Sequence, residues 1–218
     1  MAFAEQSPDF TMKIILLGDT SVGKTCLLSQ YVNGVFSTVG QATVGVGYGA
    51  KTLEIRGQNV RLQIWDTVLP TQAGQEAFRS ITRSFYRGAN AACVVYNITS
   101  KASYDSLEQW IADLKAQSGG QILIYILGNM RDLEEHREVD IKAGKALADR
   151  LGVNGFYECS AKTGENVSTA FNALAESAFL AVASSHIPDD QSSTDRNNVT
   201  RSIALTNTKA EKQGGCCK

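Results

Sequence analysis

The sequence predicts an α/β fold, with helices on both faces of a mostly parallel sheet of about six strands and one antiparallel strand at an edge. Short, continuous apolar runs recur along the chain, each followed by polar or glycine residues and then a helical pattern, as buried parallel strands require. Two other stretches alternate about a polar turn, as in a hairpin. A glycine-rich loop also stands between the first apolar run and the first helical pattern.

The first strand is predicted at residues 14–17, which read Ile-Ile-Leu-Leu. Residues of this kind are buried on both faces of a sheet. The residues before this strand show no regular pattern, so we expect residues 1–11 to form a flexible arm. The segment from Cys26 to Val32 predicts the first helix, directly after the glycine-rich loop.

The loop reads Gly-Asp-Thr-Ser-Val-Gly-Lys-Thr over residues 18–25 and predicts a phosphate-binding site. Its glycines let the backbone curl, so that N–H groups and the positive end of the helix point at one anion. Lys24 adds a positive charge for the β- and γ-phosphates, and the Thr25 hydroxyl is placed to bind Mg²⁺. A chance glycine-rich turn is the alternative, which the complete pattern between strand and helix disfavours. The nucleotide-binding residues expected here are Gly18, Asp19, Thr20, Ser21, Val22, Gly23, Lys24, Thr25 and Cys26.

The next elements form a hairpin, because apolar and polar residues alternate on both sides of Arg56-Gly57-Gln58-Asn59. Its strands are predicted at 53–55 and 60–65. Further apolar runs give strands at 92–96, 122–127 and 155–159. Apolar residues at helical spacing predict helices at 103–117, 141–151 and 166–183, and we interpret their apolar faces as core rather than as cofactor contacts.

Two later segments indicate which base the site binds. Gly-Asn-Met-Arg-Asp follows the strand 122–127, and its Asp132 can accept hydrogen bonds from both N1–H and the 2-amino group of guanine. Adenine offers no such donor pair and would leave a desolvated carboxylate unpaired. Ser160-Ala161-Lys162 follows the strand 155–159 and can offer a backbone N–H to the guanine carbonyl.

Each of these segments is weak alone, because Asn-x-x-Asp is also a common loop or cap and Ser-Ala-Lys can simply open a helix. Their order behind the phosphate loop favours GTP over ATP. The base-binding residues expected are Asn129, Met130, Asp132, Ser160, Ala161 and Lys162.

Composition limits the number of domains, the kind of partner and the cellular compartment. A chain of 218 residues suits one domain with a tail, and a formal net charge of −1 without a basic stripe argues against nucleic acid as a partner. Cys26, Cys93 and Cys159 are isolated on apolar segments, which indicates buried free thiols in a reducing compartment. We see neither a cationic leader with an apolar block nor an apolar stretch of membrane-spanning length, which predicts a chain made and kept in the cytosol.

Over residues 12–184 the sequence resembles the small GTPases of the Ras superfamily and, within it, the Rab family. Besides the nucleotide motifs, the segments that carry the resemblance are 62–67, 73–76, 78–89 and 94–99, together with a Gly-Gly-Cys-Cys ending. The resemblance implies a small GTPase domain that binds GTP and GDP with Mg²⁺ and converts GTP and water to GDP and phosphate. In these segments the sequence is most similar to Rabs of the Golgi, early secretory and recycling routes.

The resemblance also implies roles for single residues. Thr25 and Thr43 are Mg²⁺ ligands, Thr43 only while a γ-phosphate is present, and Asp66 holds the ion through water. Phe36 matches an aromatic residue that packs against the guanine edge, although a core phenylalanine at a helix end is equally consistent with the sequence. Gly74 senses the γ-phosphate through its N–H.

Gln75 is the catalytic residue that this resemblance implies, because it orients the attacking water. Loss of the γ-phosphate then frees the loops at 34–51 and 66–86, and effectors that read their ordered form dissociate. The implied partners are an exchange factor, a GTPase-activating protein, prenyl-Rab escort and dissociation-inhibitor proteins, and effectors. We expect a monomer on the cytoplasmic face of Golgi, early secretory or endosomal vesicles that cycles with the cytosol.

One departure from the family interrupts the second of these loops. The family's Asp-Thr pair runs straight into Ala-Gly-Gln-Glu, whereas here Val68-Leu69-Pro70-Thr71-Gln72 intervenes. Five extended residues span up to roughly 16 Å, so Gly74 and Gln75 reach a γ-phosphate only if the insert loops out. This predicts slow or absent hydrolysis with binding retained. The alternative function is a GTP-binding interaction module that no longer hydrolyses.

A second explanation for the insert lies in the gene. Every Val codon begins with GU and one Gln codon is CAG, so the codons for residues 68–72 could begin and end like a short intron. In that case the mature protein joins Thr67 directly to Ala73, and the loop is ordinary.

Two single residues also depart from the family. Met130 stands where the family has a lysine, which keeps the apolar stem over the base but removes charge-assisted hydrogen bonds. Gly47 replaces an acidic residue in the strip that effectors touch.

Residues 185–218 differ in composition from the rest of the chain. They are polar, poor in aromatic residues and without a strand or helix period, which predicts a disordered tail. The tail carries the adjacent Cys216 and Cys217, which the resemblance implies receive two prenyl groups, as stable membrane anchoring needs. The final Lys218 is a less usual ending for such a pair.

Overall fold

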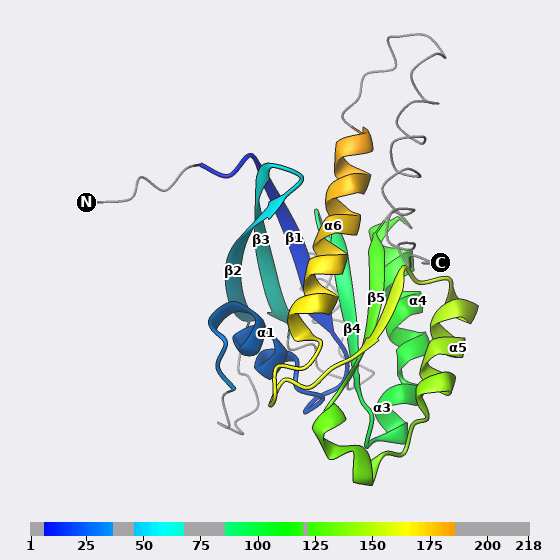
Figure 1. Ribbon diagram of the computed structural model, residues 1–218. Coiled ribbons are helices and arrows are strands. Elements are labelled where there is room, and N and C mark those ends of the chain that lie inside the picture. Colours follow the sequence, from blue (N-terminus) through cyan, green and yellow to red (C-terminus); the bar gives the residue numbers. More distant parts are fainter. Residues whose placement is uncertain (1–6, 37–45, 68–85, 120–121, 186–218) are drawn as a thin grey trace, which may run out of the picture. The chain divides into compact units, whose positions relative to one another are not determined.

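The computed structural model describes residues 7–36, 46–67, 86–119 and 122–185 (Figure 1). The chain divides into two units, Met1–Ser184 and Ser185–Lys218. The sheet and its helices belong to the first unit, except that the last helix extends to Ser185.

The predicted α/β architecture is confirmed. A six-stranded sheet has the order β2-β3-β1-β4-β5-β6. The strands β1, β3, β4, β5 and β6 pair in parallel, and β2 runs antiparallel to β3 at the edge. The strands are β1 (Phe10–Leu17), β2 (Val46–Ile55), β3 (Gln58–Thr67), β4 (Ala91–Asn97), β5 (Leu123–Asn129) and β6 (Gly155–Glu158).

Helices cover both faces of this sheet (Figure 1). On one face α1 (Lys24–Asn33) and α6 (Val167–Ser185) bury Leu27, Phe171 and Leu174 against alternate residues of β1. On the other face α4 (Leu107–Ser118) and α5 (Ile141–Leu151) bury Leu107, Ile111 and Leu147. Two separate cores result because successive residues of a strand point to opposite faces.

The first three strands are longer than their apolar runs indicate, whereas β6 ends one residue before its predicted end. β1 begins at Phe10, inside the segment predicted as a flexible arm, because the Phe10 ring packs edge-on against Phe179 at 5.2 Å between centroids. The Asp9 N–H also donates to the Asn59 carbonyl at 2.8 Å. β2 begins before its predicted range and ends with it, β3 extends to both sides of its predicted range, and only Arg56 and Gly57 remain as the turn.

The helix predicted at 103–117 is wrong in its continuity. It is two helices, α3 (Lys101–Asp105) and α4, separated at Ser106. Ser100 caps α3, and its hydroxyl accepts a hydrogen bond from the Ser103 N–H at 3.3 Å. The hydroxyl of Ser106 donates to the Ala102 carbonyl at 3.1 Å, a side-chain bond that competes with helical pairing.

The sequence did not predict the 3₁₀ helix η1 (Arg131–His136), which follows β5 directly. Its six residues lie within the segment that carries Asp132, so the base-binding motif stands on a helical turn rather than on an irregular loop. Tight turns of this type are short and therefore leave little periodicity in a sequence.

The helix α6 is long and apolar enough over Val167–Ser184 to cross a membrane, judged by length and composition alone. This differs from the expectation that no stretch reaches such a length. Phe171, Leu174 and Ala175 are fully buried in the core beside β1, and a core helix meets the same criterion. The finding is therefore weak evidence for a membrane span.

Candidate functional site

The carboxyl ends of five parallel strands lie at one edge of the sheet, and the expected site residues gather there. Leu16 of β1 pairs with Asp66 of β3, and Leu17 pairs with Val94 of β4. Further along, Asn97 of β4 pairs with Asn129 of β5, and Gly128 pairs with Glu158 of β6. The loops that leave these strands can therefore contact one ligand, as is usual in open α/β sheets.

The phosphate loop between β1 and α1 needs both of its glycines. Gly18 (φ 131°) lies so close to β4 that a Cβ atom would be 2.1 Å from the Val95 carbonyl oxygen. Gly23 (φ 91°) would place a Cβ atom 2.3 Å from Nδ2 of Asn129. Any side chain at these two positions would displace the loop from the sheet, which agrees with the predicted role of the glycines.

Lys24, the first residue of α1, turns back into this loop. Its Nζ donates to the carbonyl oxygens of Gly18 at 2.8 Å and Asp19 at 2.6 Å. Burial lowers the pKa of Lys24 from its ordinary value, while the charges of Asp66 and Asp19 partly offset this. A partly desolvated ammonium inside a ring of backbone groups is a strong site for an anion.

Asp66 lies beside Lys24 at the end of β3 and is fully buried. Its Oδ2 accepts a hydrogen bond from the Thr25 hydroxyl. Its Oδ1 is buried and has no hydrogen-bond partner among the described residues. Burial raises the pKa of Asp66, and the Thr25 hydrogen bond and the charge of Lys24 offset this only in part.

These oxygens fit Mg²⁺. The ion prefers oxygen ligands and is commonly held by one or two protein groups together with water and substrate phosphates. An unpaired buried carboxylate oxygen next to a hydroxyl is such a donor set. Within the part of the chain that the structure describes, no group of three or more His, Cys, Asp or Glu could hold a metal.

Asn129, at the end of β5, joins the two halves of the site. Its Nδ2 donates to the carbonyl of Val22 in the phosphate loop at 2.9 Å. Its Oδ1 accepts from the N–H of Ala161 at 3.0 Å. Asn129 is almost fully buried, so its amide is a rigid bridge between the phosphate loop and the turn that follows β6. The sequence placed Asn129 at the base and did not predict this bridge.

Asp132 and Ser160, which the sequence assigns to the base, lie in contact. The hydroxyl of Ser160 donates to Oδ1 of Asp132 at 2.6 Å, and Nζ of Lys162 lies 3.7 Å from Oδ2. The Ala161 N–H, however, is already paired with Asn129. The Ser160 hydrogen bond holds the Asp132 carboxylate in one orientation.

Met130 and Phe36 differ in how the structure places them. Met130 has a left-handed conformation (φ 71°), and its methyl carbon lies 3.9 Å from the position that a Cβ on Gly23 would occupy. Its side chain thus reaches the phosphate loop. Phe36 is partly buried and packs against the core that contains α1 and α6, which favours the core interpretation of this residue.

The other residues named from sequence are distributed as follows. Val22 is buried and Ser21 is left-handed (φ 63°) within the phosphate loop, beside the exposed Thr20. Cys93 and Cys159 are buried free thiols as expected, but Cys26 is only half-buried because it lies at the start of α1 near Asp66. The predictions for Thr43, Gly74, Gln75, Cys216, Cys217 and the insert 68–72 fall outside the described residues.

Two contacts of the site were missed from sequence. The indole N–H of Trp110 in α4 donates to Oδ1 of Asp19 at 2.8 Å, which fixes the phosphate loop from outside. Arg137, beyond η1, pairs with Glu158 at the end of β6 at 2.7 Å. Neither pair is visible in a local pattern, since the partners lie far apart in the chain.

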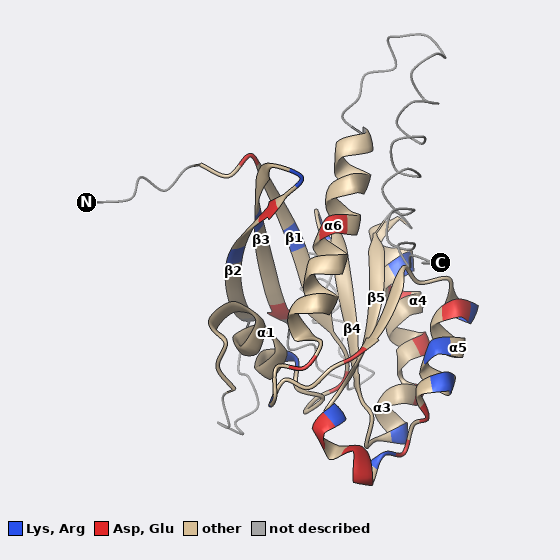
Figure 2. Cartoon of the chain, viewed as in Figure 1, with Lys and Arg blue, Asp and Glu red and all other residues tan. Residues whose placement is uncertain are grey.

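Charges of both signs are interspersed on α5 and around η1 (Figure 2). Arg150 of α5 pairs with Glu108 of α4 at 2.5 Å, and Arg137 pairs with Glu134 at 2.7 Å. Such alternation makes these described surfaces locally balanced in charge.

The chain matches a protein-family model. The model described as the Ras family matches residues 13–179 of the chain, which is more than half of its length. The matched segment runs from β1 into α6 and so includes the phosphate loop, Asp66, Asn129, Asp132 and the turn at 160–162.

Proposed function

The chain belongs to the Ras family, and from that premise we propose that it is a Rab-type switch that binds GTP, hydrolyses it to GDP and recruits effectors in vesicle trafficking. Its domain is a small GTP-binding domain with the GTPase activity that this family has in general. The finer assignment to Rab proteins rests on the sequence resemblance over residues 12–184 and on the paired cysteines near the C-terminus.

One observation carries the nucleotide part of this proposal. A phosphate-binding end made by Lys24, Thr25 and Asp66 and a purine-reading end made by Asp132 stand at the same sheet edge. Asn129 joins the phosphate loop, at the Val22 carbonyl, to the turn after β6, at the Ala161 N–H. Such a site binds a guanosine nucleotide with its phosphates in the loop at 18–25 and its base against Asp132.

The residues of the chain have distinct tasks in this reaction. Lys24 and the backbone of the phosphate loop bind and orient the phosphates, which places the γ-phosphorus for in-line attack by water. Thr25 and Asp66, with Thr43, would hold Mg²⁺, which supplies charge compensation on the β- and γ-phosphate oxygens. Gln75 orients the water, and Gly74 donates its N–H to the γ-phosphate.

The insert favours a second candidate function. Val68-Leu69-Pro70-Thr71-Gln72 begins two residues beyond Asp66 and separates it from Gly74 and Gln75. If the insert prevents these residues from reaching the γ-phosphate, the protein binds GTP but acts as an interaction module without turnover.

Calorimetry on the nucleotide-stripped full chain tests the proposal. We expect GDP and GTP to bind with Mg²⁺ far more tightly than ADP and ATP. Equal affinities for guanosine and adenosine nucleotides would contradict it. Single-turnover hydrolysis on the same material then separates the cycling enzyme from the module without turnover.

Substituting Met130 by lysine tests the base site from the other side. Lysine has a stem of similar length, and its ammonium can donate to the phosphate loop, which the methyl carbon of Met130 already approaches. One charge-assisted hydrogen bond contributes about 1.5–3 kcal/mol, so GDP dissociation should slow about 10-fold or more. Stopped-flow release of a fluorescent GDP measures this, with Met130→Leu as the control that should leave the rate nearly unchanged.

The paired cysteines are proposed as the membrane anchor. Both lie outside the described residues, so the argument rests on the Gly-Gly-Cys-Cys ending and on the need for two lipids for stable anchoring. We propose a monomer on the cytoplasmic face of Golgi, early secretory or endosomal vesicles. Its partners would be an exchange factor, a GTPase-activating protein, escort and dissociation-inhibitor proteins, and effectors.

The joint substitution Cys216→Ser with Cys217→Ser should abolish vesicle binding. Prenylated wild-type chain is expected to sediment with anionic vesicles, whereas the double variant should remain in the supernatant and each single variant should bind about 10-fold or more weakly, because one lipid chain gives only marginal binding. Co-sedimentation after treatment with prenyl transferase measures this. Wild-type sedimentation without lipid attachment would contradict the proposed anchor.

A further inference from the structure

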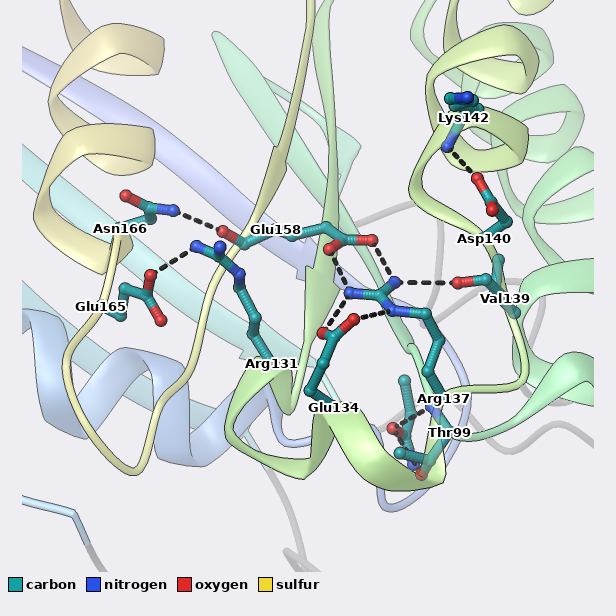
Figure 3. A network of polar contacts seen from close by, with 11 residues as sticks. Thr99, Arg131, Glu134, Arg137, Val139, Asp140, Lys142, Glu158, Glu165 and Asn166 are labelled. Atoms are coloured by element: carbon teal, nitrogen blue, oxygen red, sulfur yellow. Dashed lines mark hydrogen bonds and ion pairs between the residues drawn. The ribbon is translucent and has the colours of Figure 1, made fainter.

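Arg137 is the centre of a polar network between η1 and β6 (Figure 3). Its guanidinium donates through Nη1 and Nη2 to the two carboxylate oxygens of Glu158, each at 2.7 Å. The same group donates to both oxygens of Glu134, at 2.8 and 2.7 Å, and to the Val139 carbonyl at 2.8 Å. One side chain thus fixes the residues that follow Asp132 to the last residue of β6.

Among the described residues, the pair of Arg137 and Glu158 is the least exposed ion pair. The side chain of Glu158 is 2% exposed and that of Arg137 is 17% exposed, whereas Arg150 and Glu108 are both more than half exposed. The hydrogen bonds to Glu158, and then those to Glu134, raise the pKa of Arg137 from its ordinary value. Removing the partner of a buried carboxylate strongly destabilises the folded protein. The two parallel hydrogen bonds of this pair also require one relative orientation of the two side chains.

Glu158 lies two residues before Ser160, the first residue of the turn at 160–162. Its backbone is held independently, because Nδ2 of Asn166 donates to the Glu158 carbonyl at 2.8 Å (Figure 3). The N–H of the next residue, Cys159, donates to Gly128 of β5 at 2.8 Å. The contacts of the Glu158 side chain and backbone therefore both help to fix the position of Ser160.

Arg137 has the same relation to Asp132. Its N–H donates to the Glu134 carbonyl at 3.2 Å and closes η1, the turn on which Asp132 stands. The hydroxyl of Ser160 then donates to Asp132 at 2.6 Å. The Ser160–Asp132 contact and the Arg137–Glu158 contact thus join the same two segments, η1 with the residues that follow it and the end of β6 with its turn.

We propose that Arg137, through its buried pairing with Glu158, is a positioning residue that sets Asp132 against the turn at 160–162 and so determines the preference for guanine over a purine without the 2-amino group. The inference rests on the proposed function, since it assumes that Asp132 reads a guanine base. Asn166 supports the same geometry from the other side of Glu158.

Nucleotide release and base preference in the full chain test this role. For Arg137→Gln we expect GDP dissociation about 10-fold faster, the scale on which supporting hydrogen bonds act on a ligand site, and a smaller ratio of GDP to inosine diphosphate affinity. Arg137→Lys keeps the charge but not the bidentate contact and should restore part of this ratio. Arg150→Gln, which breaks the exposed pair with Glu108, should change neither quantity.

The second variant, Asn166→Gly, decides the matter where Arg137→Gln does not fold. Asn166 has φ 57°, which glycine adopts freely, so the substitution removes the bond to the Glu158 carbonyl without straining the turn. It should lower the same ratio. An unchanged ratio, or an equal loss of GDP and inosine diphosphate affinity, overturns the inference. A wild-type chain without preference for guanosine over adenosine nucleotides instead overturns the proposed function.

Discussion

Replacing Asp132 by alanine is expected to weaken GDP binding about 10²–10⁴-fold. The carboxylate accepts two hydrogen bonds from guanine, and each charge-assisted bond contributes about 1.5–3 kcal/mol. Ser160 already donates to Oδ1 at 2.6 Å, and this contact holds the carboxylate in one orientation. The loss should be much smaller for inosine diphosphate, which has no 2-amino group. Titration calorimetry with both nucleotides measures the two losses.

Glu135→Ala provides the matched control for this prediction. Glu135 is an exposed carboxylate on the same 3₁₀ helix as Asp132, so its removal changes the charge of η1 by the same amount. It should leave GDP affinity within about twofold, as expected for an exposed surface charge. Equal effects of the two substitutions would show that net charge, rather than a directed contact, determines binding.

Deleting residues 68–72 is expected to raise single-turnover GTP hydrolysis about 100-fold. The deletion joins Thr67 to Ala73 and brings Gly74 and Gln75 close to Asp66, which lies beside Lys24 and Thr25 at the phosphate end. A misplacement of about 1 Å can reduce a rate 10²-fold, and the insert adds five residues between Thr67 and Ala73. Phosphate release from GTP-loaded protein measures the rate, and GDP affinity should stay nearly the same.

The deletion should act through Gln75. In a chain that also carries Gln75→Leu, removing residues 68–72 should raise hydrolysis little, because no side chain then orients the water. A parent chain that already hydrolyses GTP at the rate of the deletion variant would contradict the prediction. Sequencing of the transcript decides the separate question of the gene, since reads that join Thr67 to Ala73 identify the insert as a retained intron.

Much of the fold could be predicted because its determinants are local. Apolar runs such as 14–17 and 92–96 lie within β1 and β4, and the alternating stretches about Arg56 and Gly57 form the antiparallel hairpin. The break at Ser106 could not be predicted from apolar spacing, because the spacing continues across it and only a hydroxyl contact marks the boundary. The turn η1 was missed since short 3₁₀ helices carry little periodicity.

In the candidate site, too, the sequence indicated some of the residues that come together and gave no sign of others. The contact of Ser160 with Asp132 agrees with the two base motifs, and the Thr25 contact with Asp66 agrees with the expected metal site. The bonds from Asn129 to Val22 and from Trp110 to Asp19 join residues 107 and 91 positions apart. Residue types at one position do not specify such partners, because the pairing depends on the order of strands in the sheet.

The amide of Asn129 couples release of the phosphates to release of the base, because it bonds to the segments at both ends of the site. Since one side chain holds both the Val22 carbonyl and the Ala161 N–H, displacement of either segment removes a restraint from the other. A regulator that displaces the phosphate loop alone is therefore expected to weaken binding of the purine as well. Nucleotide release would then be cooperative across the whole pocket, although the regulator touches only one end of it.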